Sequence, residues 1–436
     1  MEDALDSDGT SNSSITDEED VSPGLTQPIL NSRHFITPGV SKLIFDAIKK
    51  KSIPLQERLC VLLFNEIDLA LHLDYLTKED YIIGFEDTGW SRNKNVADTA
   101  LVFMLRSIYG NWKQPVAFAF HDSPLNQKTL VRFIKTIAKE TKNAGLNLIA
   151  MICTHADHNV ETVDMLLEES KSVVLEGQEV VPIFDPSSLL LSTRNALSEA
   201  PLTFKKDGVL KTAKWEHLVK AHEIDRELSN CLTKITKSHL APDSLSFTKC
   251  IQTLSGTFAG FLSTVAGKTG ATLPPAATET AELLFFLDRV FDSLNGTMAE
   301  NAEKPLRGPI RATSPHSKIW SEAKETFKDM DGKGGSWFGK WLRTLDAFEA
   351  IKSKMLALGY EAFPARSFHL EPLQNCFDLI NEQAGNTPME NRLTCKKFSI
   401  FYNRALKAKD MAACRATEPI CEPDGLKFLV TIEDLS

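Results

Sequence analysis

Leu-Asn-Leu-Ile-Ala-Met-Ile-Cys, residues 146–153, is a nearly continuous apolar run of the kind found in a strand buried inside a parallel sheet. Just before it, residues 130–142 carry apolar side chains at helical spacing, which predicts a helix. Further upstream, β-branched and aromatic runs separated by turn-like stretches predict strands at residues 59–68, 81–85, 100–108 and 115–121. The sequence therefore predicts an α/β unit.

The order of strands, a helix and then another buried strand is that of an RNase H-like core. Beyond residue 195 the pattern changes, and helical spacing of apolar residues predicts helices at 215–229, 245–265 and 280–294. Residues 300–345 are rich in Gly, Lys and Pro, and another helix is predicted from about residue 371. The predicted fold class is α/β, an RNase H-like core interrupted by a mostly helical insertion domain.

This pattern divides the chain into six segments. We assign them as a disordered acidic tail (1–32), a linker helix (33–58), the first part of the RNase H-like core (59–195), the helical insertion domain (196–365), the closing helix of the core (366–405) and a C-terminal tail (406–436).

Composition narrows the class of protein. The 436 residues include eight cysteines without a CxxC pair, which disfavours both a zinc finger and a disulfide framework. No apolar run approaches the roughly 20 residues of a membrane span, and the start does not resemble a signal peptide. We expect no membrane association and a cytosolic or nuclear protein.

Charge is unevenly distributed along the chain. The net charge is −9, and residues 1–32 hold eight Asp or Glu and no Lys or Arg. Such a segment is expected to be disordered and to repel phosphate backbones, so any nucleic-acid binding needs a local basic surface. The basic triplet at 49–51 has two interpretations, a nuclear signal or the solvated end of a helix, of which we favour the second.

One segment resembles a known family. Residues 95–106 (Asn-Val-Ala-Asp-Thr-Ala-Leu-Val-Phe-Met-Leu-Arg), followed by Trp-Lys-Gln-Pro at 112–115, resemble the ALVFM run and WKxP turn of P-element and THAP-type transposases. Five further stretches resemble that family's motifs in the same order: Phe-Asn-Glu-Ile at 64–67, Cys-Thr-His-Ala at 153–156, Asp-Pro-Ser-Ser-Leu-Leu at 185–190 with Arg-Asn at 194–195, Phe-Asp-Ser-Leu-Asn at 291–295, and Leu-Glu-Pro-Leu-Gln-Asn at 370–375. The resemblance spans roughly residues 33–400.

The chain departs from this family in several places. Ser188 and Leu191 replace a His and a Lys of one motif, and we find neither the zinc-coordinating THAP module nor a leucine zipper. The largest departure concerns the metal ligands. The resemblance implies two divalent metals held by two Asp and one Glu, at positions that read Asn65, Thr154 and Gln374 here.

These three substitutions predict that the catalytic function is lost. Mg²⁺ binds through carboxylate oxygens, and an amide or hydroxyl supplies a dipole without a charge. Two cations close together need anions to offset their repulsion. We therefore expect a degenerate transposase that is not an enzyme and that has lost the ancestral Mg²⁺.

A displaced metal site remains an alternative. Asp157 lies three residues after Thr154, and Glu371 and Asp378 flank Gln374 on one helical face, although ordinary helix-surface acids are the favoured interpretation. Glu66 follows Asn65 on the predicted strand and therefore points to the opposite side of it, so Glu66 cannot easily replace the missing carboxylate. The sequence His-Ala-Asp-His at 155–158 lacks further ligands nearby and is interpreted as a polar loop.

The insertion raises the question of a nucleotide. Gly-Lys-Thr at 267–269 lacks the first glycine of a P-loop and is a chance match. The resemblance implies a GTP-binding insertion with an Asn-x-x-x-Asp pattern that contacts guanine, and here the pattern reads Asp288 and Asp292. Asp288 cannot donate to the guanine O6 as an Asn would, and we expect GTP binding to be lost. A GTP-binding scaffold is the remaining alternative.

Residues 333–341 (Lys-Gly-Gly-Ser-Trp-Phe-Gly-Lys-Trp) mix cations with aromatic side chains. Such a composition suits a surface that stacks on bases, but we favour a loop that leads into a helix with a buried Trp and Phe. The expected function is that of a domesticated, catalytically inactive protein that acts by binding. We expect a protein partner, nucleic acid bound weakly or through a partner, and a nuclear location.

Overall fold

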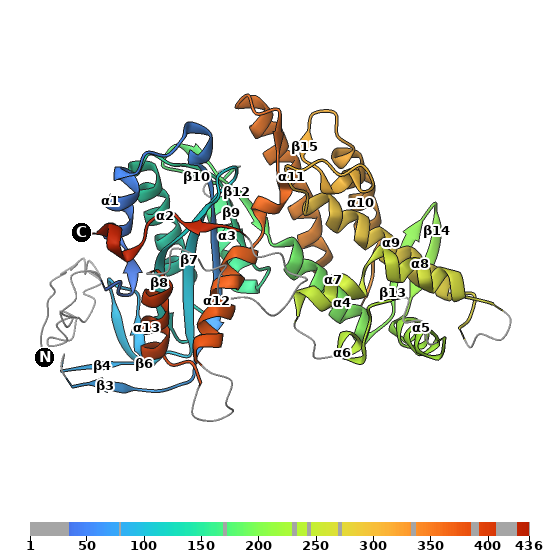
Figure 1. The fold of residues 1–436 in the computed structure, drawn as a ribbon, viewed down its shortest axis with the longest axis horizontal. Helices are drawn as coiled ribbons and strands as arrows, with labels where there is room; N and C mark the ends of the chain where they lie inside the picture. The colour runs from blue at the N-terminus through green and yellow to red at the C-terminus, as the bar shows by residue number, and fades with distance from the viewer. Residues whose placement is uncertain are drawn as a thin grey trace, which may run out of the picture.

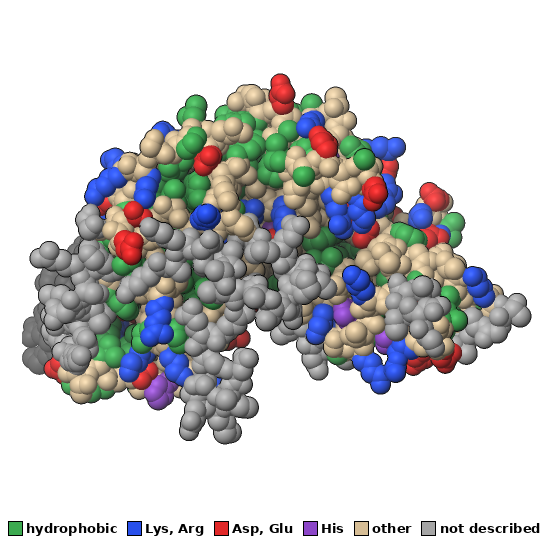
Figure 2. All heavy atoms as spheres, viewed as in Figure 1, with side chains coloured by type: hydrophobic (Ala, Val, Ile, Leu, Met, Phe, Trp, Pro, Cys, Tyr) green, Lys and Arg blue, Asp and Glu red, His purple; other side chains and the backbone are tan. Residues whose placement is uncertain are grey.

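The computed structural model describes residues 35–77, 80–168, 172–228, 233–241, 246–268, 273–332, 337–384, 392–406 and 425–435. The predicted acidic tail lies outside the described residues, as does most of the predicted C-terminal tail. The described chain forms a sheet-based core and a mostly helical part beside it (Figure 1). On the face shown in Figure 2, Lys, Arg, Asp and Glu side chains are dispersed over both parts.

A mixed sheet forms the centre of the core. Its path is β12-β9-β2-β7-β8-β5-β6, and β1 and β17 also pair with β8. β2, β7 and β8 are antiparallel neighbours, whereas β9 is parallel to β2 and β12 is parallel to β9. The strands on this path are β2 (Leu59–Asp68), β5 (Phe85–Asp87), β6 (Arg92–Val96), β7 (Thr99–Ser107), β8 (Trp112–His121), β9 (Asn147–Cys153) and β12 (Val181–Phe184). A separate hairpin joins β3 (Asp74–Leu76) to β4 (Tyr81–Ile83).

The central strands are apolar because both faces of the sheet are covered. Every residue of β7 and β8 is buried. Phe103 stacks on Phe133 of α2 (Gln127–Asn143), with 5.0 Å between ring centroids. On the other face, Phe118 lies 5.4 Å from Phe398 of α13 (Cys395–Ala405). Alternation of side chains along the strands thus sends one set towards α2 and the other towards α13.

The helices connect the strands in the predicted order. α2 is capped by the Asn126 side chain, which accepts from Lys128 N, and it leads into β9. α3 (Asp157–Glu168) follows β9 and packs against α2. α12 (Glu371–Ala384) contacts β2 from the side that α13 also covers. The segment predicted as one closing helix thus contains α12 and α13, with residues 385–391 between them outside the described residues.

The segment predicted as a linker helix also contributes to the core. β1 (Gly39–Val40) pairs with β8, and α1 (Lys42–Lys50) follows it. A short 3-10 turn, η1 (Leu55–Arg58), then leads into β2. Near the other end of the chain, β17 (Lys427–Phe428) adds a parallel strand to β8, and η6 (Ile432–Leu435) contacts α1. Both ends of the described chain are therefore packed against the sheet.

The helical part is inserted between α4 and α12. Its own core is built around Trp320 and Trp341, which are fully buried. Three further elements precede the helical part in the chain: β10 (Val174–Leu175), β11 (Gln178–Glu179) and α4 (Pro186–Glu199). The elements of the helical part are β13 (Leu202–Lys206), β14 (Val209–Ala213), α5 (Trp215–Glu227), α6 (Lys237–Leu240), α7 (Phe247–Thr253), α8 (Gly256–Val265), α9 (Ala277–Leu294), η2 (Pro305–Arg307), β15 (Ile310–Arg311), α10 (His316–Lys328), α11 (Phe338–Ala357), β16 (Ala362–Phe363) and η4 (Ala365–Phe368).

One long helix joins the insertion to the sheet. α11 packs against the edge strand β12, and Thr344 Oγ1 donates a hydrogen bond of 3.1 Å to the carbonyl oxygen of Phe184. Trp341 Nε1 donates to Thr193 Oγ1 of α4 at 3.2 Å. Trp341 is therefore part of a core, as favoured for the aromatic segment, whereas residues 333–336 lie outside the described residues. None of the described helices has the length and apolar character needed to cross a membrane.

Candidate functional site

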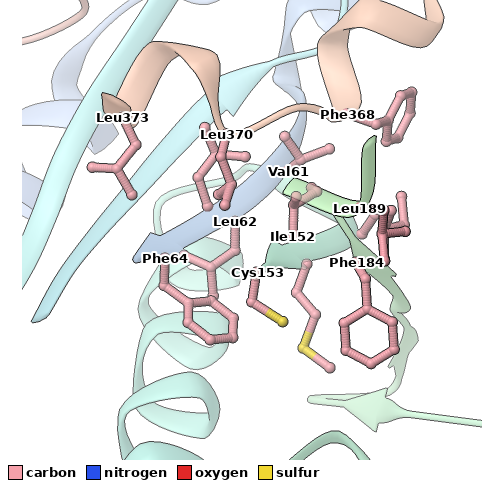
Figure 3. Close-up of a cluster of buried hydrophobic side chains, with 14 of the residues drawn as sticks. Val61, Leu62, Phe64, Ile152, Cys153, Phe184, Leu189, Phe368, Leu370 and Leu373 are labelled. Atoms are coloured by element: carbon pink, nitrogen blue, oxygen red, sulfur yellow. The ribbon is translucent and has the colours of Figure 1, made fainter. Parts of the chain in front are cut away.

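The three predicted metal-ligand positions lie around one end of the sheet. β2 and β9 run parallel with Leu63 opposite Ile152, so continuing this register sets Asn65 beside Thr154. α12, which carries Gln374, packs on β2. Figure 3 shows Val61 of β2 on the side of Leu370 and Leu373, with Leu62 and Phe64 on the other side. By alternation, Asn65 shares the side of Val61 and faces α12.

The uncharged side chains of Thr154 and Gln374 form hydrogen bonds with neighbouring residues of the chain. Thr154 Oγ1 accepts from Asn159 Nδ2 at 3.0 Å, and Gln374 Nε2 donates to Asp378 Oδ1 at 3.0 Å. Asn65, Thr154 and Gln374 are half-buried. The carboxamide at 374 thus acts as a donor towards a neighbouring acid, a role that a carboxylate could not fill.

The acids of the predicted displaced metal site have partners within the chain. The Glu371 carboxylate accepts from Arg366 Nε at 3.1 Å and from Nη2 at 2.8 Å, a bidentate pair. The Asp157 side chain is 93% exposed and lies 3.3 Å from Lys340 Nζ. Within the described parts of the chain, no group of three or more His, Cys, Asp or Glu side chains is arranged to hold a metal ion.

The two histidines of the His-Ala-Asp-His sequence have different partners. His155 Nε2 lies 2.9 Å from Ser192 Oγ, whereas His158 Nε2 lies 3.5 Å from Glu66 Oε1. Burial, followed by the charge of Lys340, lowers the pKa of His155 to about 4. The sequence was interpreted as a polar loop, but α3 begins at Asp157 and places His158 in its first turn.

Glu66 belongs to a cluster that sequence reasoning missed. Its Oε1 lies 3.3 Å from Nε2 of the buried His121, in addition to the contact with His158. The cluster joins β2, β8 and α3 on the face of the sheet opposite to Asn65. Its members are separated by more than 35 residues in sequence, and only the fold brings them together. Glu66 therefore cannot turn towards Asn65 and the other predicted metal-ligand positions without leaving both histidines.

In the insertion, Asp292 is buried and already paired. Its Oδ1 lies 2.6 Å from Arg307 Nε and its Oδ2 lies 3.1 Å from Lys304 Nζ. The same Lys304 Nζ is 3.6 Å from Asp288 Oδ2. Both predicted guanine contacts lie on α9 and share one cation. A guanine base that used Asp292 would have to replace Arg307 and Lys304, which are donors supplied by the chain itself.

Asp185, in the segment that resembles a family motif, has a structural role. It is buried, and its Oδ2 accepts from Ser188 N at 2.8 Å while its Oδ1 accepts from Leu370 N at 2.9 Å. It therefore caps α4 and holds the residue that precedes α12. Burial raises the pKa of Asp185 and lowers that of His369, whose Nδ1 lies 4.0 Å away.

Comparisons with known proteins agree with this architecture. The sequence model of the TNP-like RNase H N-terminal domain matches residues 36–167, and that of the TNP-like GTP-binding insertion domain matches residues 187–305. Together they match more than half of the chain. The chain therefore belongs to the P-element transposase-like family, which confirms the resemblance and the predicted RNase H-like core with a helical insertion.

A solved structure has the same fold. The Drosophila P element transposase in a strand transfer complex superposes with a TM-score of 0.71 at 18% sequence identity, and the match covers 87% of this chain and 84% of that one. At that identity the likeness establishes the fold alone. No curated protein matches the chain in sequence.

Proposed function

We propose that this chain is a transposase-derived protein that no longer cuts or joins DNA and acts by binding. The observation that carries the proposal is the charge of the former metal site. Asn65, Thr154 and Gln374 occupy its three positions without a carboxylate among them. Mg²⁺ binds weakly to neutral oxygen ligands alone, and a two-metal reaction needs both ions.

The fixed partners of the nearby acids support the same proposal. An alternative enzyme with a displaced site would recruit Asp157, Glu371 or Asp378. Glu371 would first have to leave the guanidinium of Arg366, and Asp378 would have to give up the hydrogen bond from Gln374. Asp157 extends into solvent at the start of α3. None of these changes is compensated by an existing contact.

A DNA-nicking assay tests the loss of catalysis. Purified chain is incubated with supercoiled plasmid and Mg²⁺ or Mn²⁺, and relaxed product is measured beside an Asp157→Ala/Asp378→Ala variant. We expect identical background in both samples. Metal-dependent nicking by the wild type that disappears in the double variant would establish the displaced-site enzyme and overturn the proposal.

The binding role is tested separately. We propose a protein as the main partner, because the scaffold is intact while the catalytic carboxylates are replaced, and a nuclear location, which is inferred from the family resemblance. Affinity capture of the full chain from nuclear extract, with and without nuclease, distinguishes a protein partner from nucleic acid. Recovery of the same protein after nuclease supports the proposal. Recovery of nucleic acid alone contradicts it.

A second candidate, the GTP-binding scaffold, is less well supported because Asp292 is saturated by Arg307 and Lys304. We propose that the ancestral nucleotide site has been replaced by this internal ion pair.

A further inference from the structure

α2 carries a row of positive charges on its outer face. Five residues at successive spacings of four, three, four and three fall on one stripe of the helix, and all five are exposed. We call this row the α2 cationic stripe; its members are Lys128, Arg132, Lys135, Lys139 and Lys142. The helix spans 17 residues, so the stripe runs for roughly 25 Å.

The stripe is not explained by the stability of the helix. Like charges at these spacings disfavour an isolated helix by about 0.2–0.5 kcal/mol per pair. Ion pairs of opposite sign occur on other helices, although α3 carries acids alone at a similar spacing, Asp157, Glu161 and Asp164. In α10, Lys328 Nζ lies 2.8 Å from Glu325, and Lys324 of α10 lies 2.8 Å from Asp346 of α11. Beside the stripe, Glu140 is half-buried. A row of one sign is suited to an anionic ligand.

The same chain contains a segment of complementary charge. Residues 1–32 carry eight acidic side chains and no Lys or Arg, and they account for eight of the nine excess negative charges of the chain. Four of these acids are consecutive, at 17–20. The rest of the chain is nearly neutral, so the two features are local and opposite.

The path of the chain brings this segment within reach. The described residues begin at Phe35, and β1, which follows at once, contacts α2. α1 lies beside α2 (Figure 1) and adds the exposed Lys49 and Lys50. The 14 residues between Asp20 and Phe35 can extend up to roughly 50 Å, about twice the length of the stripe. Tethering also gives the segment an effective concentration on the order of millimolar.

We propose that residues 1–32 dock on the α2 cationic stripe of the same molecule and cover it in the free protein. The contact consists of carboxylate to ammonium and guanidinium pairs on an exposed surface, so it weakens with salt. A ligand with phosphate groups would compete with the segment for the same side chains. The inference does not rest on the loss of catalysis or on the identity of the main partner.

Lysine acetylation of the full chain, measured by mass spectrometry, tests the contact. The comparison variant replaces all eight acids of residues 1–32 by Asn or Gln and leaves every lysine in place as a reporter. We expect Lys128, Lys135 and Lys139 to react several-fold faster in this variant at low ionic strength, and the difference to vanish in high salt. The exposed Lys220, Lys234 and Lys237 of the insertion are matched controls and should not change.

Carbodiimide cross-linking then identifies the contact directly. In a mixture of isotope-labelled and unlabelled chains, we expect cross-links from residues 1–32 to the stripe within one isotopic form. Mixed-isotope cross-links would show docking on a second molecule and overturn the intramolecular form. Equal lysine reactivity in wild type and variant would overturn the contact itself. If duplex DNA protected the stripe equally in both proteins, with no effect of the acids, the stripe would be a nucleic-acid surface and the proposal would fail.

Discussion

At the residue scale, Asp292 is a buried acid held by two cations of the chain itself. Its carboxylate is buried on α9 and both oxygens accept charged hydrogen bonds, from Arg307 and Lys304. The two cations are each about two-fifths exposed, so water reaches them from the other side. The carboxylate is therefore the buried member of the cluster and the one whose removal matters most.

We predict that Asp292→Ala lowers the free energy of unfolding by about 2 kcal/mol, because two charge-assisted hydrogen bonds are lost. Urea denaturation measures the change. Asp288→Ala, which removes only the longer contact with Lys304, is the matched control and should cost less. GTP should leave the melting temperature of the wild type unchanged. A GTP-dependent rise that is lost in Asp292→Ala would instead establish a retained guanine site.

We predict that the free energy of unfolding depends on pH through the buried His155. Burial, with Lys340 nearby, lowers the pKa of this histidine to about 4 in the folded chain. In the unfolded chain the same histidine binds a proton near pH 6.5. The neutral His155 therefore contributes its full stability above pH 6.5, and this contribution is lost as the pH falls from 6.5 towards 4, because protons then favour the unfolded chain. At pH 5.5 the loss is about 1 kcal/mol.

Replacing His155 by Gln should remove this part of the acid sensitivity. The measurement compares unfolding free energies at pH 7.5 and 5.5 in the wild type and in the variant. His72→Gln, at a histidine whose side chain is 58% exposed, is the control and should keep the wild-type difference. If His155→Gln shows the same loss as the wild type, His155 is not the neutral buried group described here.

At the scale of elements, Asp185 connects two helices that are far apart in sequence. It lies at the end of β12, caps α4 through Ser188 N and receives Leu370 N at the start of α12. We predict that Asp185→Ala lowers the free energy of unfolding by about 2–4 kcal/mol, because two buried backbone donors lose their acceptor. Asp185→Asn keeps one carbonyl acceptor and should cost less. If Asp185→Ala and Asp185→Asn both changed the free energy of unfolding by equal and small amounts, Asp185 would not hold both helices.

The elements also show what the sequence could predict. The strand at 59–68 was predicted at its observed bounds, and the start of the helix near residue 371 was predicted correctly, because strong periodicity and a long apolar run define them locally. β12 was not predicted, since four residues are too few for a pattern. α10 lies inside the stretch that was described only as rich in Gly, Lys and Pro, although its Trp320 is fully buried.

For the candidate site, the sequence predicted the positions of the residues but not their partners. The positions 65, 154 and 374 were found from motifs, and the parallel register of β2 and β9 then sets the first two side by side. The partners of these residues were not predictable. The pairing of Glu66 with His121 and His158, or of Asp292 with Arg307, depends on contacts between separate elements that no local pattern encodes.

At the scale of the whole molecule, the two ends of the described chain are joined across the sheet. β17 pairs with β8, Val430 N donates to the buried Gln114 Oε1 at 2.8 Å, and Lys51 Nζ lies 2.8 Å from Asp434 Oδ1. Residues near the C-terminus thus cover the edge of the sheet near α1.

We predict that deletion of residues 425–436 lowers the melting temperature by several degrees, because it exposes buried apolar surface and leaves Gln114 without its backbone donor. Differential scanning fluorimetry measures the shift. Asp434→Asn, which weakens mainly the half-exposed ion pair with Lys51, should cost less than about 1 kcal/mol. A deletion without effect would show that the segment is dispensable for the fold.

We propose that this fold has lost a metal site by losing charge at three positions while keeping their arrangement. Calorimetric titration with Mg²⁺ of the wild type and of an Asn65→Asp/Thr154→Asp/Gln374→Glu variant tests it most directly. We expect no measurable heat of Mg²⁺ binding in the wild type and saturable binding in the triple variant, because the register of β2, β9 and α12 returns the three carboxylates to one site. Saturable Mg²⁺ binding by the wild type, abolished by Asp157→Ala/Asp378→Ala, would contradict it.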